Sequence, residues 1–429
     1  MDRIKGSPWH CLFSATLGFF IGFAAVALFG PTAHKFKDVM GLSPVMMGFL
    51  VAIPSLSGSL LRIPFGAWVD TTGGRKPFII LLTLSFVGMA SLLALIFFLY
   101  PAKLNAGYYP LLLFMGILCG CGIATFSVGI GQVSYWFPQK QQGTALGRYA
   151  GIGNMAPGLF SLMLPLSLAG WGLSGSYLAW LLFLGAGIII YLATGRNACY
   201  FQLLEAGISP AEARANASKM GQEIFPSGGA MHGLRTAARI WKTWVLVAIY
   251  FTTFGGFIAL TAWFPTYWIA FYGQKVAIAG VLTAAFSLVA SIIRVGGGSI
   301  SDRLGGEKTA VIALSALLVG SLVMTLSGNF ALSITGEVLM AAGMGVTNAA
   351  VFKLVPQEVK EAVGGAAGWV GGIGAFGGFA IPPLMGLFVR INGNSGYSSG
   401  FSIFIGLTIF ALILAYLLHR THTPTDKKV

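Results

Sequence analysis

Twelve apolar runs, each long enough to cross a lipid bilayer, constrain this chain more than any other feature. A transmembrane helix needs roughly 20 mostly apolar residues to cross a hydrocarbon core of about 30 Å. A polar stretch separates the sixth run from the seventh, so the runs fall into two sets of six. The sequence therefore predicts an all-α polytopic membrane protein with twelve transmembrane helices. The runs lie at about 9–29, 45–69, 77–100, 108–136, 144–168, 176–195, 242–271, 277–300, 309–327, 331–355, 363–389 and 399–418.

Composition excludes the other classes of protein. Of the 429 residues, 56% are hydrophobic and only 9% are charged, whereas a soluble domain averages about 25% charged residues. So few charges cannot cover a water-facing surface, and disorder requires the opposite balance. The four cysteines have no spacing typical of a disulfide framework or a metal site. We therefore expect neither a metal nor a cofactor.

The positive charge gives the orientation. The chain has 26 Lys and Arg residues against 12 Asp and Glu, a net charge of +14. An even number of spans puts both termini on one side, and if that side is cytoplasmic, the only basic loop residues outside are Lys35, Lys37, Lys103, Lys275 and Arg390. This bias predicts a multi-pass protein of the cell (inner or plasma) membrane with cytoplasmic termini. The charge thus reflects the lipid bilayer as partner and not nucleic acid, and we expect a monomer.

Two internal repeats divide the chain. The end of the second run, RIPFGAWVDTTGGRK at 62–76, aligns with RVGGGSISDRLGGEK at 294–308 in the eighth. Likewise GTALGRYAGIGN at 143–154 in the fifth run aligns with GGAAGWVGGIGA at 364–375 in the eleventh. Repeats of this kind build transporters that bind substrate between two halves.

We therefore expect three parts: a six-helix half at 1–195, a cytoplasmic linker at 196–241 and a six-helix half at 242–429. Within the linker, Ser209 followed by Pro210 predicts the start of a short surface helix.

The first repeat resembles the signature loop of the major facilitator superfamily, and it occurs twice in register. The small residues allow close approach of helices, and the acid with its following basic residues can form a charge cluster that latches one conformation. The resemblance thus predicts a latch formed by Gly66, Asp70, Arg75, Lys76, Gly298, Asp302 and Lys308.

One arginine in each repeat lies deep in the membrane. Arg62 and Arg294 each come eight residues before a signature Asp, or about 12 Å along a helix, and half the hydrocarbon core is about 15 Å. Each such arginine costs about 2.5–3.5 kcal/mol to insert, so a functional role is the default interpretation. Glu337 is the only acid within the spans, and one carboxylate cannot neutralise two guanidiniums. The arginines are therefore predicted to bind an anion.

Guanidinium is planar and donates paired hydrogen bonds, which suits a small planar oxyanion. The aromatic side chains of Phe126, Tyr250 and Phe254 can form a narrow slot, and Asn154 and Tyr250 can donate directional hydrogen bonds. Glycines at every fourth position, Gly143, Gly147 and Gly151 in the fifth span and Gly364, Gly368 and Gly372 in the eleventh, allow helices to pack closely and to rock.

Three segments carry a closer resemblance. GIATFSVGIGQVSYWFP, GTALGRYAGIGNMAPG and GGAAGWVGGIGAFGGFAIPP resemble the nitrate-signature regions of the NarK-type nitrate/nitrite porters. The resemblance implies a major facilitator fold and nitrate and nitrite as substrates. It also implies that Arg62 and Arg294 clamp the anion, and that the pocket includes Asn154, Phe126, Tyr250 and Phe254.

We expect nitrate/nitrite antiport by alternating access. The alternatives are nitrate–proton symport with Glu337 as the carboxyl group, a facilitator for another small anion such as a short carboxylate, and a transport-inactive sensor. Glu337 can equally be a structural hydrogen-bonding residue near a helix end. No nucleophile–base or metal constellation lies in the spans, so the chain is not expected to be an enzyme.

Overall fold

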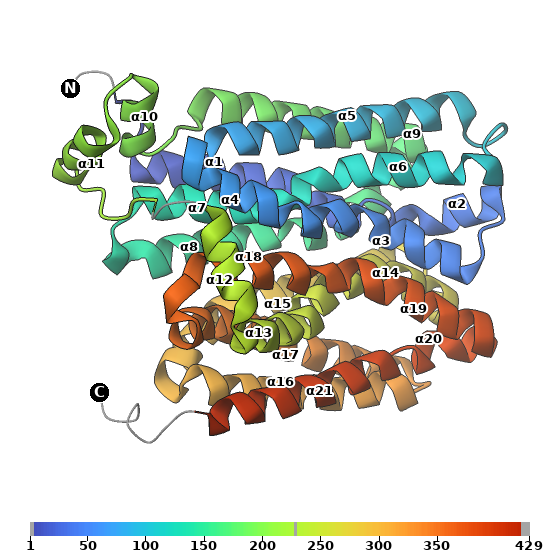
Figure 1. Cartoon of the computed structure of the whole chain (residues 1–429). Helices are drawn as coiled ribbons and strands as arrows, with labels where there is room; N and C mark the ends of the chain where they lie inside the picture. Colours follow the sequence, from blue (N-terminus) through green and yellow to red (C-terminus); the bar gives the residue numbers. More distant parts are fainter. Residues whose placement is uncertain (1–3, 227–229, 422–429) are drawn as a thin grey trace.

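The computed structural model describes residues 4–226 and 230–421, without the side chains at positions 139, 142, 143, 230 and 302. All regular elements in these ranges are helical, and the long helices run side by side in one long bundle (Figure 1). Up to the linker, the α-helices are α1 (Pro8–Phe23), α2 (Ala33–Met40), α3 (Pro44–Leu60), α4 (Arg62–Thr72), α5 (Arg75–Leu99), α6 (Tyr109–Gly120), α7 (Thr125–Trp136), α8 (Gln139–Asn154) and α9 (Ala156–Thr194).

Three short helices follow in the linker, and nine more complete the chain. The linker helices are α10 (Cys199–Glu205), α11 (Pro210–Lys219) and α12 (Ala230–Arg239). The others are α13 (Trp241–Tyr250), α14 (Gly256–Tyr272), α15 (Val276–Leu304), α16 (Gly306–Leu326), α17 (Phe330–Glu358), α18 (Val363–Ile373), α19 (Gly377–Asn392), α20 (Gly396–Ser399) and α21 (Ser402–Arg420).

Eleven segments of the described chain are long and apolar enough to cross a membrane, and one of them provides two crossings. The segment Thr144–Thr194 has 51 residues, far more than the roughly 20 that one crossing needs. Gly172 interrupts it with φ +65°, a conformation that glycine adopts easily. The segment starts and ends at the same end of the bundle (Figure 1). The twelve expected crossings are therefore present.

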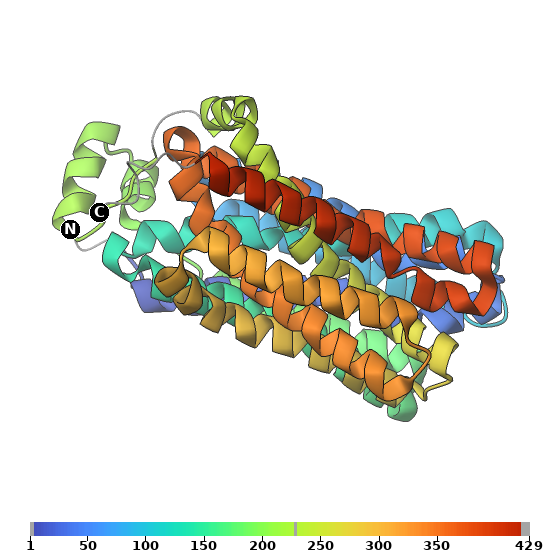
Figure 2. The same ribbon diagram turned by 90° about the horizontal axis from the view of Figure 1, so that it is seen from below.

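Both α10 and α11 lie at one end of the bundle, together with the start of α1 and the end of α21 (Figures 1 and 2). We call this the linker end and the opposite end the far end. The predicted start of a linker helix is confirmed, because the Ser209 side chain accepts a hydrogen bond from the backbone N–H of Glu212 at the start of α11. The linker also forms α10 and α12, which the sequence analysis did not predict.

Several long helices are interrupted near mid-membrane. Met155 separates α8 from α9 and Leu61 separates α3 from α4, while Phe251–Gly255 forms a π-helical turn between α13 and α14. A 3₁₀ turn at Cys121–Ala124 precedes α7. Such irregular turns are common at functional sites. Three of the four interruptions border or contain a residue expected in the pocket, and the 3₁₀ turn ends two residues before Phe126.

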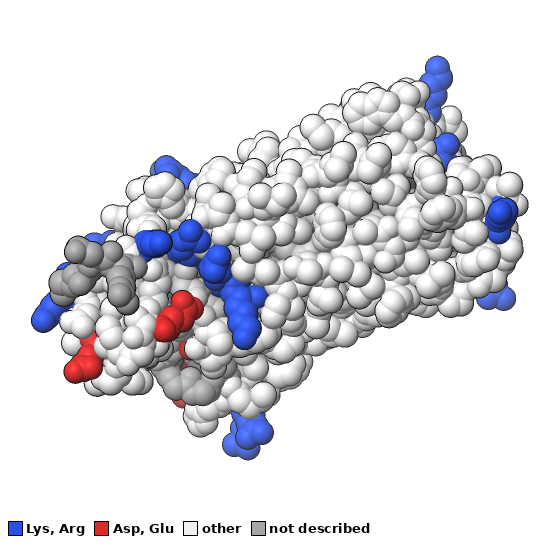
Figure 3. All heavy atoms as spheres, turned by 90° about the horizontal axis from the view of Figure 1, so that it is seen from above, with Lys and Arg blue, Asp and Glu red and all other residues white. Residues whose placement is uncertain are grey.

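The surface of the bundle matches a membrane environment. On the face drawn in Figure 3, Lys, Arg, Asp and Glu gather at the two ends and leave a broad middle zone without charge. Large apolar side chains are exposed along the outer helices, for example Phe98 of α5 and Ile189 of α9. In water such a surface would be unstable, whereas lipid chains cover it without cost.

Candidate functional site

Arg62 and Arg294 meet at the same two aromatic rings. The Cζ atom of Arg62 lies 4.8 Å from the ring centroid of Phe126 and 5.2 Å from that of Phe254. The Cζ atom of Arg294 lies 6.0 Å and 5.3 Å from the same centroids. The distances to Phe254, 5.2 and 5.3 Å, mean that the two Cζ atoms are at most 10.5 Å apart. Two permanent positive charges thus lie in one aromatic chamber.

Arg62 is held by backbone carbonyl groups. It is fully buried at the start of α4, and its Nε donates to the Gly58 carbonyl across the break at Leu61, 3.1 Å. Its Nη1 donates to the carbonyl of Gly371 in α18, also 3.1 Å. Among the described residues its Nη2, which is buried, has no hydrogen-bond partner. One NH2 group of a fully buried cation is thus left for an acceptor.

Arg294 is held more loosely. It lies in the interior of α15 with its side chain partly exposed, and its Nη2 donates to the Tyr250 hydroxyl over a long 3.4 Å. Its Nη1 is buried and finds no hydrogen-bond partner in the described part of the chain. Each arginine therefore presents one unsatisfied nitrogen, which native structures rarely tolerate in a buried position. An anion between the arginines would supply the missing acceptors.

Of the remaining predicted pocket residues, Tyr250 lies with the arginines and Asn154 lies to one side. The Tyr250 ring stacks on Phe254 at 4.8 Å, and its hydroxyl contacts Arg294. Asn154 is buried, and its backbone carbonyl accepts from Ser291, about one helical turn before Arg294 on α15. Its side-chain oxygen has no partner, and among the described residues no hydrogen bond links its side chain to either arginine.

Sequence reasoning missed three groups of the chamber. Phe352 of α17 packs edge-on against Tyr250 at 5.2 Å and lies 5.9 Å from the Cζ of Arg294. The Tyr149 hydroxyl donates to the carbonyls of Thr125 and Phe126, each at 3.0 Å, and so holds the start of α7 in place. The third is the Gly371 carbonyl. Tyr149 and Gly371 lie in the repeated glycine segments, and this position in the sequence could have pointed to them. No sequence feature points to Phe352.

Glu337 lies away from the chamber. It precedes Phe352 by fifteen residues of α17, or about 22 Å. It is 1% exposed, its Oε1 has no hydrogen-bond partner, and the Trp268 side chain lies beside it. One turn earlier, Ser333 shares a hydrogen bond of 2.7 Å with the Tyr272 hydroxyl. Among the described residues no cation pairs with Glu337.

The first signature loop is ordered by neutral partners. Tyr135 of α7 donates to Asp70 at 2.6 Å, and Arg75 donates to the Leu192 carbonyl at 3.1 Å. The Lys76 amine lies 5.8 Å from the ring of Trp68. Within the described chain Asp70 forms no ion pair with Arg75 or Lys76. Gly66 lies against α7, since a Cβ atom there would be 3.3 Å from Ser127.

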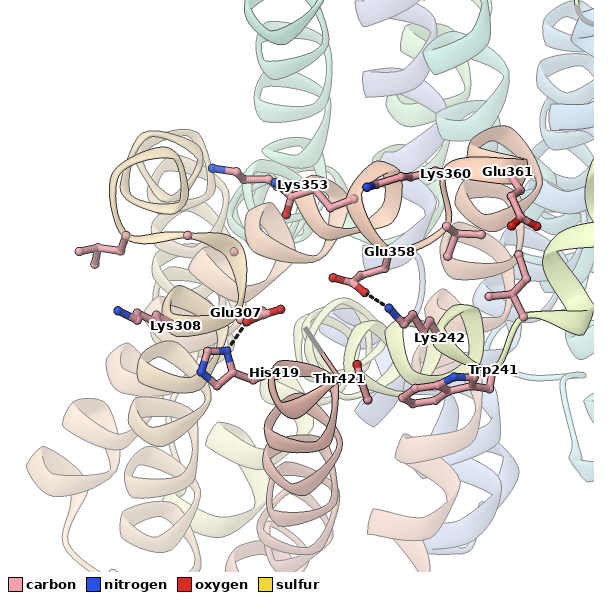
Figure 4. A pocket seen from close by; sticks show the side chains of 16 residues that line it. Trp241, Lys242, Glu307, Lys308, Lys353, Glu358, Lys360, Glu361, His419 and Thr421 are labelled. Atoms are coloured by element: carbon pink, nitrogen blue, oxygen red, sulfur yellow. Dashed lines mark hydrogen bonds and ion pairs between the residues drawn. The ribbon is translucent and has the colours of Figure 1, made fainter. Parts of the chain in front are cut away.

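The second signature loop borders a cavity of about 820 Å³ at the linker end (Figure 4). Lys308 lines this cavity, a Cβ atom on Gly298 would meet no other atom within 4 Å, and the Asp302 side chain lies outside the described residues. Across the cavity Lys242 donates to Glu358 at 2.7 Å, and His419 bonds to Glu307 (Figure 4). The repeated loops therefore have different surroundings.

Helices α3 and α9 approach α19 and α15 closely at the far end, where the two expected halves meet. There a Cβ atom on Gly48 would lie 2.5 Å from the Pro382 carbonyl oxygen, and one on Gly386 would lie 2.4 Å from that of Pro44. Gly280 of α15 approaches the Ser161 carbonyl of α9 in the same way. Toward the linker end, Cβ atoms on Gly147, Gly298 and Gly364 would meet no atom of the described residues within 4 Å. The far end is therefore closed.

The chain matches one known protein family over most of its length. A family model described as the Major Facilitator Superfamily matches residues 15–382 and 272–429. The chain belongs to the Major Facilitator Superfamily. It is accordingly a transporter by family and not an enzyme, and the all-α fold predicted from its sequence is confirmed.

This superfamily member resembles several named proteins. It is 30% identical over 405 residues to the "Probable nitrate/nitrite antiporter NarK1" of Thermus thermophilus, a match that covers 90% of this chain and 86% of the relative. It is 27% identical to the "Probable nitrate transporter NarT" of Staphylococcus epidermidis, covering 94% of each chain. The "Nitrite extrusion protein" of Bacillus subtilis is 25% identical, covering 96% and 95%. The NarK-type resemblance is thereby confirmed.

Solved structures agree on the fold. The xylose transporter XylE from E. coli in a "partially occluded inward open conformation" superimposes with a TM-score of 0.71 at 16% identity, covering 98% of this chain and 99% of that one. A bacterial homologue of the human lysosomal transporter Spinster gives a TM-score of 0.67 at 16% identity, covering 98% and 100%. At these identities the similarity concerns the fold alone.

Proposed function

We propose that this protein exchanges nitrate for nitrite across a membrane by alternating access, with Arg62 and Arg294 as the anion clamp. One observation carries the proposal. Two arginines share the rings of Phe126 and Phe254, and each keeps one buried nitrogen without an acceptor. A small planar oxyanion satisfies both nitrogens at once and offsets the repulsion between the two cations. The named relatives support nitrate and nitrite as that anion.

The other pocket residues select for size and shape. The rings of Phe126 and Phe254 lie 6.0 Å apart at 29°, and Phe352 closes the side next to Arg294. Flat rings exclude bulky anions. Tyr250 orients Arg294, and the unpartnered Asn154 amide can turn toward a bound anion once the two halves close.

We infer that the chain works as two six-helix halves, residues 1–195 and 242–429, joined by a linker at 196–241. The excess of basic residues at the linker end supports a cytoplasmic position for that end and for both termini. On this basis the structure is an inward-facing state, since the far end is closed. One chain carries every group of the site, so we expect a monomer to transport.

The arginine pair also supports exchange as the mode of transport. At an effective dielectric constant near 20, two unit charges about 10 Å apart repel by about 2 kcal/mol. Closure of an empty site would raise this cost, whereas a bound anion removes it. The protein would then switch quickly between its inward-facing and outward-facing states only with an anion bound. Neither arginine can release a proton near neutral pH, so the exchange needs none.

Uptake of labelled nitrate into proteoliposomes tests the proposal. Vesicles preloaded with nitrite should take up nitrate much faster than vesicles without internal anion. Acetate should compete weakly, because its methyl group adds bulk out of the plane that suits nitrate in the aromatic slot. Equal uptake of nitrate and acetate would favour a general anion facilitator. If nitrate binds but is not taken up by vesicles either with or without internal nitrite, a transport-inactive sensor would be favoured.

A further inference from the structure

The linker helix α12 is fixed firmly to the C-terminal part of the bundle. The indole N–H of Trp369 in α18 donates to the Leu234 carbonyl of α12, and that of Trp244 in α13 donates to the Ala238 carbonyl, each at 2.9 Å. The two indole rings lie 5.5 Å apart. Two hydrogen bonds from neighbouring helices to the carbonyls of α12 make this a docked helix.

The docking requires glycine at one position of α18. A Cβ atom on Gly365 would lie 2.1 Å from the carbonyl oxygen of Gly233 in α12, a distance that no real structure tolerates. The backbones of α12 and α18 therefore pack in direct contact. The neighbouring Gly364 differs, because a Cβ atom there would meet no other atom within 4 Å. Substitution of these two adjacent glycines should thus have opposite consequences for α12.

The place where α12 docks is the groove between α4 and α18. Glycines at every fourth position of α18 share one face. At Gly372 that face packs on Ile63 of α4, whereas one turn toward the linker end, at Gly368, it packs on Leu234 of α12. At Gly364 the face is open. Leu234 is 7% exposed, and α12 also contacts α4 (Figure 1). Leu234 therefore fills the groove at the point where α4 leaves α18.

We propose that α12 is a wedge that holds α4 and α18 apart at the linker end and must leave the groove before that end can close. The proposal rests on alternating access between two halves. In the opposite state the linker ends of the halves come together. Gly147, Gly298 and Gly364 have open space at the Cβ position as far as the described residues go, and they are free to make that contact. The linker would thereby favour the inward-facing state and limit the turnover of the carrier.

Gly365→Ala in the full-length chain tests the wedge, with Gly364→Ala as the matched control. The four native cysteines are replaced by alanine, and one reporter cysteine is introduced by Ala284→Cys. Ala284 is buried in α15, ten residues from Arg294 on the side of the far end, and its backbone carbonyl lies close to Gly158 of α9. Loss of the wedge should raise the labelling rate of the reporter several-fold in the Gly365→Ala protein relative to the control.

A second reporter shows whether α12 has moved. In a separate background, Leu234→Cys should become reactive in the Gly365→Ala protein and stay protected in the control. If that cysteine reacts while the Ala284→Cys reporter does not, the wedge is wrong. If Gly365→Ala does not fold, Trp369→Phe removes one docking hydrogen bond without a clash and should act in the same direction, and unchanged labelling there would also overturn the proposal. Cysteine labelling needs no substrate, so it tests the wedge even if the protein does not transport nitrate.

Discussion

The two arginines of the chamber occupy equivalent places in the two repeats but are held very differently. Arg62 is fully buried, and its guanidinium donates to the carbonyls of Gly58 and Gly371 at 3.1 Å. Arg294 is partly exposed, and its hydrogen bond to Tyr250 is 3.4 Å long. The Gly371 bond also links α4 to α18, across the predicted boundary between the halves. Arg62 is thus a fixed, preorganised cation, whereas Arg294 can adjust its position.

The rigid Arg62 and the more mobile Arg294 suit two different tasks of an anion clamp. A rigid donor orients the anion at little entropic cost, and a mobile donor follows the anion when the site changes shape during transport. The comparison predicts that substitutions near Arg62 affect both stability and affinity, while those near Arg294 affect affinity alone.

The largest effect is expected for Arg62→Lys and Arg294→Lys. Lysine keeps the charge but loses the planar fork, and hydrogen bonds to charged groups contribute about 1.5–3 kcal/mol. Nitrate affinity of the purified protein, measured by calorimetry, should fall about 10- to 100-fold in each variant. Only Arg62→Lys should also lower the melting temperature without nitrate, because it loses two bonds to the backbone. Unchanged affinity in both variants would contradict the clamp.

A smaller effect is expected for Tyr250→Phe. The substitution removes the hydroxyl that contacts Arg294 and keeps the ring that stacks on Phe254. A lost hydrogen bond of about 1 kcal/mol corresponds to a loss of nitrate affinity of roughly fivefold. Tyr149→Phe is the control, since its hydroxyl bonds to the backbone near Phe126 and should change thermal stability more than affinity. An equal loss of affinity in both variants would mean that Arg294 needs no partner.

Much of this architecture can be predicted from the sequence because each membrane helix requires a long apolar run. Long apolar runs predict most of the spans within a few residues, although the first span continues to Met40 where the sequence predicts an end near residue 29. The repeat alone predicts that Arg62 and Arg294 occupy related depths. Helix periodicity does not show which side chains face each other across the bundle. The position of Phe352 in the site therefore could not be predicted, because its approach to Arg294 depends on the tertiary packing of α17 against α15.

The linker shows the same limit. Ser209 is a strong local signal and predicts α11 correctly, because an N-cap acts within its own turn. The place of α12 instead depends on Gly365 and Trp369, more than a hundred residues away in the sequence. No local pattern in Ala230–Arg239 predicts that its Leu234 occupies a groove.

A conformational effect with little change in affinity is expected for Asp70→Asn. Asp70 lies on α4 with Arg62, eight residues closer to the linker end, and accepts a hydrogen bond from Tyr135. Loss of its charge should shift the balance of states, seen as altered labelling of the Ala284→Cys reporter, while nitrate affinity stays within about twofold. Tyr135→Phe, which removes the donor, should shift labelling in the same direction. Lost nitrate binding with unchanged labelling would assign Asp70 to the site and not to a latch.

The smallest effect is expected for Glu337→Gln, and it decides the mode of coupling. Glu337 is buried about 22 Å along α17 from Phe352, and no cation among the described residues pairs with it. Glutamine is almost the same size, so nitrate/nitrite exchange at the distant arginines should continue at an unchanged rate. The critical assay uses vesicles that contain no exchangeable anion and an inward proton gradient. If nitrate accumulates there, and if Glu337→Gln abolishes that accumulation, then the carrier is a proton symporter and the arginine pair does not enforce exchange.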